Sequence, residues 1–144
     1  MAETMDRVRQ VMEAVHNMHV LATVDAAGRP QMRWMGALVE CPKTPWTFYL
    51  ACHKGSRKLQ QLAQNNRAQL LFSQIEQWLV ASVSGTAEEV DTPELRQLLW
   101  DAIPQMHQYY SGADDPAMGI IRFKACCGEL LAMGEGPEPQ RFEL

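Results

Sequence analysis

The chain has 144 residues, of which 47% are hydrophobic and 21% charged, and its formal net charge is −4. This length suits one domain that buries about two thirds of its unfolded surface, and the composition excludes a disordered or collagen-like chain. A net negative charge argues against broad nucleic-acid binding, which normally needs a clustered basic surface. No apolar run reaches the roughly 18 residues of a membrane span, and Met1–Asp6 is acidic where a signal peptide is basic, so we expect a cytoplasmic protein with no membrane partner.

The first third of the chain predicts a helix followed by three strands. Residues 4–18 carry apolar side chains at three- and four-residue spacing, which is typical of an amphipathic helix. Apolar and β-branched residues at 19–25, turn residues at 26–30 and a second strand-like run at 31–40 predict a β-hairpin. After a break that contains two prolines, residues 46–52 predict a third strand.

The rest of the chain predicts more strands and one further long helix. Residues 68–73 and 78–88 predict strands that pair antiparallel, because the link between them is too short for a crossover. A Thr-Pro-Glu start predicts a helix over residues 92–102. Two further strands are predicted at 118–126 and 129–133.

These elements predict a single domain over residues 1–134, followed by a flexible tail at 135–144 that lacks apolar periodicity. Six or so mostly antiparallel strands with helices at the ends favour a small barrel, because closing a sheet removes its exposed edges. The expected fold class is therefore α+β and mainly β.

The four cysteines are Cys41, Cys52, Cys126 and Cys127, and they fit no Cys-x-x-Cys metal spacing. We expect reduced thiols and no metal site. Adjacent residues of a regular strand point to opposite faces, so Cys126 and Cys127 are expected to face apart.

The clearest chemical signature lies in the turn between the third strand and a short helix predicted at 59–66. Ser56 follows a glycine there, and Lys54, Arg57 and Lys58 supply three cations. The first N–H groups of a helix have no partner within it, and the dipole adds about half a positive charge, so such a turn can bind a phosphate. The alternative is that Ser56 only caps its helix while the cations are solvated.

Three segments lie in the order and spacing of a known family. They are Gly28–Met35, Phe48–Lys58 with the Gln-Leu and Asn-Asn pairs that follow it, and Val83–Glu88. Over residues 5–125 the chain resembles the FMN-binding split β-barrel proteins related to pyridoxamine 5′-phosphate oxidase, and within them the group similar to general stress protein 26. The resemblance implies an antiparallel split β-barrel of six to seven strands with helices at its ends.

The resemblance also implies FMN as the cofactor and assigns the residues that bind it. These residues are Arg33, Trp34, Met35, Ala51, Cys52, Ser56, Arg57 and Lys58. Arg33, Trp34 and Met35 would lie along the flavin ring and ribityl chain. The backbone of Ala51 and Cys52 would flank the edge of the ring. Ser56, Arg57 and Lys58 would hold the phosphate. The phosphate role agrees with the anion-binding turn identified from the residues themselves.

The resemblance further implies a homodimer with a flavin site at the subunit interface, each site completed by the second chain. Candidates for that interface, or for the open face of the flavin, are Trp78, Trp100, Tyr109 and Tyr110. The alternative for each of these aromatic residues is ordinary core packing.

Departures from the oxidase pattern bear on the reaction. Where the oxidase has the lysine that holds the substrate phosphate, this chain has Leu38. The glutamine that precedes the Val-x-Gly segment of the oxidase's fifth strand aligns with Val80. The oxidase's C-terminal tryptophan and Arg-x-His have no counterpart in this chain. A phosphorylated vitamer would lack paired charge, so pyridoxamine phosphate oxidation is not expected.

We therefore expect an FMN-dependent oxidoreductase that acts on a small molecule, with a nicotinamide as a candidate reductant and no catalytic residue assigned. One alternative is a non-catalytic flavin carrier or redox sensor. Another is a different cofactor in the same cleft, haem or a deazaflavin, for which His53 or His107 would matter.

Overall fold

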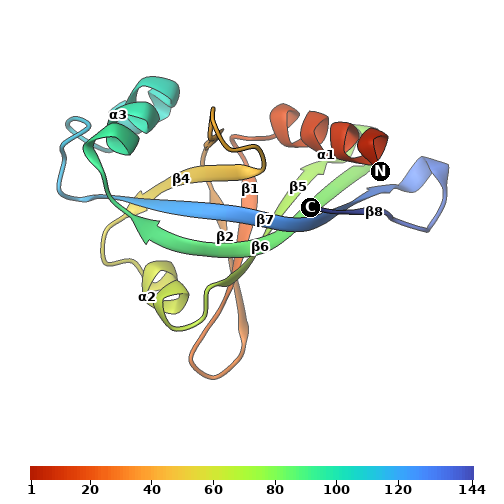
Figure 1. The fold of residues 1–144 in the computed structure, drawn as a ribbon, viewed down its shortest axis with the longest axis horizontal. Coiled ribbons are helices and arrows are strands. Elements are labelled where there is room, and N and C mark those ends of the chain that lie inside the picture. Colours follow the sequence, from red (N-terminus) through yellow and green to blue (C-terminus); the bar gives the residue numbers. More distant parts are fainter.

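The computed structural model describes residues 1–144 as one eight-stranded antiparallel sheet with three α-helices packed around it (Figure 1). The helices are α1 (Ala2–Ala14), α2 (Arg57–Gln64) and α3 (Pro93–Ala102). The sheet curls into a half-barrel, which confirms the predicted class of a mainly β, α+β split barrel. None of the helices combines the length and the apolar character that crossing a bilayer requires.

The strands are β1 (His19–Val24), β2 (Pro30–Met35), β3 (Leu38–Glu40), β4 (Thr47–His53), β5 (Arg67–Gln74), β6 (Leu79–Val90), β7 (Met118–Ala132) and β8 (Gln140–Glu143). Their order across the sheet is β2-β1-β5-β6-β7-β4-β3, and β8 pairs with β7. The long strands β6 and β7 lie along each other, and β7 pairs with β4 through its first half and with β8 through its second (Figure 1).

Two predicted strand boundaries differ from those observed. The single strand expected at residues 31–40 is divided into β2, which pairs with β1, and β3, which pairs with β4. The two strands expected at 118–126 and 129–133 are one continuous strand, β7. Gly36 interrupts the first run, whereas the second stays paired with β6 along its length.

The main core lies between the sheet and helix α1. Buried side chains alternate along β5, where Ala68, Leu70 and Phe72 point inward, because successive residues of a strand face opposite sides. Val8 and Val11 of α1 pack into the same core. A second, smaller core joins α3 to the adjoining parts of β4 and β7.

A β-bulge in β7 changes the expected orientation of two cysteines. Ser84 pairs with Cys127 while Gly85 pairs with Ala125, so Cys126 is an extra residue in β7. The extra residue breaks the alternation, and the sulfurs of Cys126 and Cys127 lie 3.5 Å apart. The prediction that these two side chains face apart is therefore wrong. A Cβ at Gly85 would lie 1.9 Å from a carbonyl oxygen of β7, which explains the glycine opposite the bulge.

The C-terminal residues take part in the sheet. The sequence predicts a flexible tail at 135–144, but the structure places β8 there, paired with β7. Phe142 is only 2% exposed, and its ring centroid lies 5.0 Å from that of Trp46. A single buried aromatic residue, too short a pattern to show periodicity, fixes this strand against the core.

Candidate functional site

A cleft of about 390 Å³ opens beside the ends of β2 and β4. Five of the eight predicted cofactor-binding residues line it: Trp34, Met35, Ala51, Cys52 and Lys58. Met35 and Cys52 are buried, whereas Trp34 is exposed at the mouth. The structure thus brings together four of the five strand residues that the resemblance assigns to the flavin ring and ribityl chain. The other three predicted residues, Arg33, Ser56 and Arg57, do not line this cleft.

The opposite wall of the cleft comes from the end of α3 and the 3-10 turn Pro104–Gln108 (η2). Its residues include Ile103, Met106, Tyr109 and Tyr110. Both tyrosines are candidates from the sequence, whereas Ile103 and Met106 carry no signal there, because the helix predicted at 92–102 ends before Pro104 and no periodicity continues beyond it. Tyr110 is buried with its ring centroid 5.3 Å from that of His53, and Tyr109 is 70% exposed.

Ser56 stands directly before α2, in extended conformation, after a glycine with a φ of +72°. Its hydroxyl makes no capping bond to the helix. The Oγ atom is buried and makes no hydrogen bond of ordinary geometry within the chain, although it lies close enough to the Cys52 thiol to oppose the rise of that thiol's pKa. The cap that the sequence left as an alternative is therefore absent, and an oriented hydroxyl remains beside the unpaired N–H groups of the helix start.

Arg33 extends from β2 toward the same helix. Its guanidinium donates hydrogen bonds to Thr23 Oγ1 at 2.8 Å and to Gln61 Oε1 at 3.1 Å, and both acceptor residues are buried. Burial, followed by the positive charge of Arg57, lowers the pKa of Arg33. The positive charge of Arg57 therefore acts on Arg33, and an anion bound near both groups would offset it.

The remaining cations of the turn divide into two groups. Lys54 pairs with Asp91 at 3.0 Å and so points away from the turn. Arg57 and Lys58 form no ion pair with any carboxylate of the chain. The structure therefore leaves Arg57 and Lys58, with the Ser56 hydroxyl, as the groups available to an anion at the start of α2.

Cys52 is the thiol nearest to this chemistry. It is buried, and burial raises the pKa of its thiol above the ordinary value, although the charge of Lys58 opposes that shift. Burial therefore disfavours the thiolate, which is the nucleophilic form, and the side chain packs in the main core.

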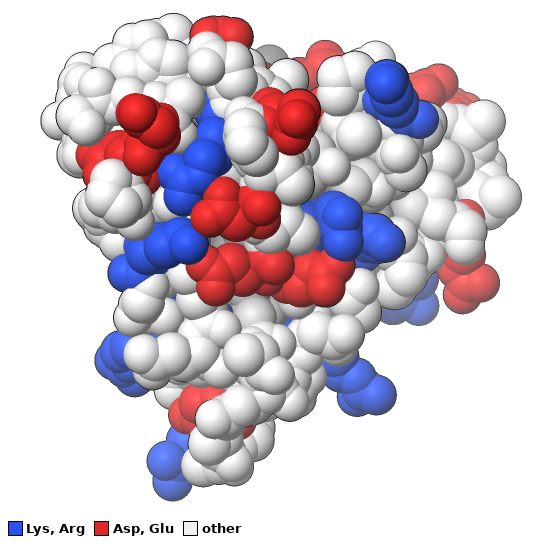
Figure 2. Space-filling model, turned by 60° about the vertical axis from the view of Figure 1, so that its left-hand side comes forward, with Lys and Arg blue, Asp and Glu red and all other residues white.

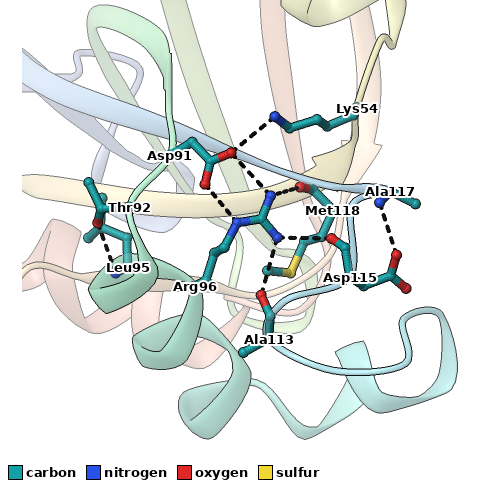
Figure 3. A network of polar contacts seen from close by, with 9 residues as sticks. All are labelled: Lys54, Asp91, Thr92, Leu95, Arg96, Ala113, Asp115, Ala117 and Met118. Atoms are coloured by element: carbon teal, nitrogen blue, oxygen red, sulfur yellow. Dashed lines mark hydrogen bonds and ion pairs between the residues drawn. The ribbon is translucent and has the colours of Figure 1, made fainter.

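A polar network holds α3, and with it the far wall of the cleft, against the sheet (Figure 3). Arg96 donates to Asp91 Oδ1 at 2.6 Å and to the backbone carbonyls of Ala113, Asp115 and Met118. Lys54 bonds the same aspartate, and these two partners lower the pKa of Asp91 to about 2. One arginine thus ties the helix start to the following loop and to β7.

Charged side chains on the face drawn in Figure 2 are mixed in sign. Lysine and arginine atoms alternate with aspartate and glutamate atoms, and no single basic field covers this face. This face lacks the clustered basic surface that nucleic-acid binding normally requires.

Comparisons with known proteins agree with this geometry. The sequence profile of the pyridoxamine 5′-phosphate oxidase family matches residues 5–126. Among solved structures, a Clostridium acetobutylicum protein related to general stress protein 26 superposes with a TM-score of 0.82 at 21% identity, covering 96% of this chain and 93% of the other. General stress protein 26 from Bacillus anthracis gives 0.78 at 16% identity, covering 96% and 97%.

A heme binding protein from Mycobacterium smegmatis also shares the fold, with a TM-score of 0.71 at 15% identity over 94% of this chain and 56% of the other. A comparison with curated proteins found no match. At these identities the structural likeness shows a shared fold, while the profile match over most of the chain shows common descent.

Proposed function

The chain belongs to the pyridoxamine 5′-phosphate oxidase family, and from this premise we propose that it is an FMN-binding flavoprotein acting as an oxidoreductase on a small molecule. Proteins of this fold commonly bind flavin or haem. The observation that carries the choice of FMN is the buried, unpartnered hydroxyl of Ser56 at the start of α2. A hydroxyl, the N–H groups of a helix start and two unpaired cations together suit a phosphate ligand.

The residues divide into a phosphate end and a ring end. Ser56, Arg57 and Lys58 would bind the phosphate, and Arg33 stands beside them, held by Thr23 and the helix. The ring end is the cleft wall formed by Trp34, Met35, Ala51 and Cys52. Bound there, the flavin would supply the hydride or electron transfer. The chain's own part is to orient the ring and to keep water from its buried side.

The substrate that we propose is not the phosphorylated vitamer on which the parent oxidase acts. Leu38 packs against the hydrophobic core where the oxidase has a lysine, and Val80 lies on β6 where it has a glutamine. The far wall of the cleft, with Ile103 and Met106, is apolar. A small uncharged molecule suits such a wall better than a phosphorylated vitamer, whose charge would stay unpaired.

We propose a homodimer as the working form. Large apolar side chains are exposed on the outer face of the sheet: Trp34 is 76% exposed, and Leu71 lies on the same face, each paired with Val20 of β1. Trp78 is 64% exposed and has a φ of +55°, a conformation that bulky residues rarely adopt. Large exposed apolar side chains of this kind are typical of a contact between copies.

Haem is a second candidate, because one feature of the cleft favours it. His53 lines the cleft with its side chain exposed, and a histidine is a common axial ligand of haem iron. A histidine-bound haem would not need the cations of the Ser56 turn. The two cofactors therefore make different demands on the same cleft.

Titration of the purified protein with FMN tests the proposal. We expect saturable quenching of flavin fluorescence and a shifted visible spectrum, followed by bleaching when a reduced nicotinamide is added without oxygen. Bound flavin that no nicotinamide bleaches would favour a carrier or sensor over a nicotinamide-dependent reductase. Haem binding with no FMN binding would contradict the proposal outright.

A further inference from the structure

The bulge in β7 places two thiols side by side at the surface of the protein. Cys126 is exposed and Cys127 half-buried, and their sulfurs are 3.5 Å apart. The contact with the Cys126 sulfur is the main cause that raises the pKa of the Cys127 thiol. Neither thiol belongs to the cofactor cleft, whose lining contains only Cys52 among the cysteines.

The backbone that carries this pair is fixed on both sides. Cys127 is paired with Ser84 of β6 and with Glu143 of β8. The carbonyl oxygen of Cys126 accepts a hydrogen bond of 3.0 Å from the N–H of Leu144. The two sulfurs are therefore presented by a strand that cannot twist without losing ladder hydrogen bonds.

This geometry does not suit a direct disulfide. A disulfide needs sulfurs about 2.0 Å apart and α-carbons roughly 4.4–6.8 Å apart, whereas adjacent α-carbons across a trans peptide are about 3.8 Å apart. Consider an atom bonded to both sulfurs at about 2.3 Å, the length of a metal–thiolate bond. With the sulfurs 3.5 Å apart, the angle between its two bonds to sulfur would be about 100°. That angle suits a pyramidal trivalent centre.

The surroundings favour a bridging atom that brings its own third substituent. No group of three or more histidine, cysteine, aspartate or glutamate side chains is arranged to hold a metal ion, so a metal on these two thiols would lack a third protein ligand. A hollow of about 480 Å³ adjoins Cys126 and is lined on its other sides by residues of β1, β2, β5 and β6, among them Ala22, Pro30 and Gln69. It has room for an organic group next to the sulfurs.

We propose that Cys126 and Cys127 form a dithiol site that chelates a trivalent organoarsenical. In the reaction with R–As(OH)₂, each S–H proton leaves with one arsenic hydroxyl as water while an S–As bond forms. Two S–As bonds replace two As–O bonds, two waters are released, and no oxidation state changes. The organic group R lies in the adjoining hollow.

The test treats the reduced, full-length protein with one equivalent of phenylarsine oxide and follows the intact mass while excess 2-mercaptoethanol is present. We expect a single adduct that the monothiol does not remove and that 2,3-dimercaptopropanol does. Cys126→Ser and Cys127→Ser should each release the arsenical to the monothiol at least about tenfold faster. Cys41→Ser should behave as the wild type.

A matched control separates geometry from mere adjacency. Ala125 faces the core, so Ala125→Cys combined with Cys127→Ser keeps two adjacent cysteines but turns one inward. Circular dichroism first establishes that each variant is folded. Retention of the arsenical by this double variant would overturn the proposal. Equal release from the wild type and Cys126→Ser, or a wild type isolated as the Cys126–Cys127 disulfide, would overturn it as well.

Discussion

Ser56 stands where a serine is expected to cap a helix, but in the structure it does not. A serine before a helix is normally a cap, yet this hydroxyl is buried, does not cap α2 and has no partner. A buried unpaired hydroxyl costs free energy in the absence of a ligand. Under the proposed function, a phosphate that accepts a hydrogen bond from this hydroxyl, beside Arg57 and Lys58, would offset that cost.

We predict that Ser56→Ala leaves the free energy of unfolding of the apoprotein within about 0.5 kcal/mol of the wild type, because no capping bond is lost. The same variant should bind FMN several-fold more weakly. Urea denaturation and a flavin fluorescence titration measure the two effects separately. Loss of about 1 kcal/mol of stability with unchanged FMN affinity would instead identify Ser56 as a helix cap.

His19 is the buried titratable residue of the main core. Its ring stacks on Phe72 at 4.9 Å, its Nε2 has no partner, and burial lowers its pKa from 6.5 to about 4. The unfolded chain therefore takes up a proton at a higher pH than the folded one. The stabilisation is complete above the unfolded value and is lost as the pH falls toward the folded value.

We predict that the free energy of unfolding falls by about 3 kcal/mol as the pH is lowered from 6.5 to 4. His19→Leu should flatten the pH dependence across this window, even if its stability at neutral pH differs. Urea midpoints at half-unit pH steps give the comparison. An equally steep decline in His19→Leu would show that another group causes it.

At the scale of elements, α3 and η2 owe their position to a few polar bonds and one small core. Arg96 joins Asp91 to three backbone carbonyls (Figure 3). Leu99 packs in the smaller core, together with residues of β4 and β7. The same segment forms one wall of the cleft. Loosening this anchor is therefore expected to disturb the wall before it disturbs the barrel.

We predict that Arg96→Lys destabilises the protein by about 2 kcal/mol, because one ammonium cannot replace a guanidinium that bonds a carboxylate and three carbonyls. Hydrogen exchange should rise first in residues 111–117. The matched control is Arg141→Lys, whose side chain is 75% exposed and bonds only Glu129, with an expected change below about 0.5 kcal/mol. Equal effects from both substitutions would show that the network does not anchor α3.

The sequence predicts local elements well and long-range pairing poorly. Turn chemistry and alternation predict the hairpin of β1 and β2, and the Thr-Pro-Glu start predicts α3, whose Thr92 caps it as expected. Residue spacing could not reveal the bulge at Cys126, because it depends on how β6 pairs with β7. Likewise, β8 depends on one buried ring, Phe142.

The part of the candidate site that lies on continuous sequence motifs could be predicted from the sequence. The strand and turn segments carry all eight predicted residues, and the cleft contains five of them. The far wall, with Ile103 and Met106, lies some fifty residues away along the chain and carries no motif of its own. Only tertiary packing brings it opposite Cys52.

At the scale of the whole molecule, the exposed apolar face accounts for the proposed dimer. We predict that Leu71→Glu, which places a charge on that face, converts a dimer to a monomer and weakens FMN binding, because each site would lose its second chain. Sedimentation equilibrium measures the mass. Gln10→Glu, on the exposed side of α1, is the control and should remain a dimer. A wild type that sediments as a monomer while binding FMN would contradict the dimer proposal.

The most direct test of the FMN-phosphate site compares FMN with riboflavin, which lacks the phosphate, in Arg57→Ala/Lys58→Ala. Each charge-assisted bond contributes roughly 1.5–3 kcal/mol, so FMN affinity should fall about 100-fold or more while riboflavin affinity changes less than about threefold. Lys43→Ala, in the turn before β4, should change neither affinity. An equal loss of affinity for both flavins, or no loss for either, would show that the Ser56 turn does not hold the phosphate.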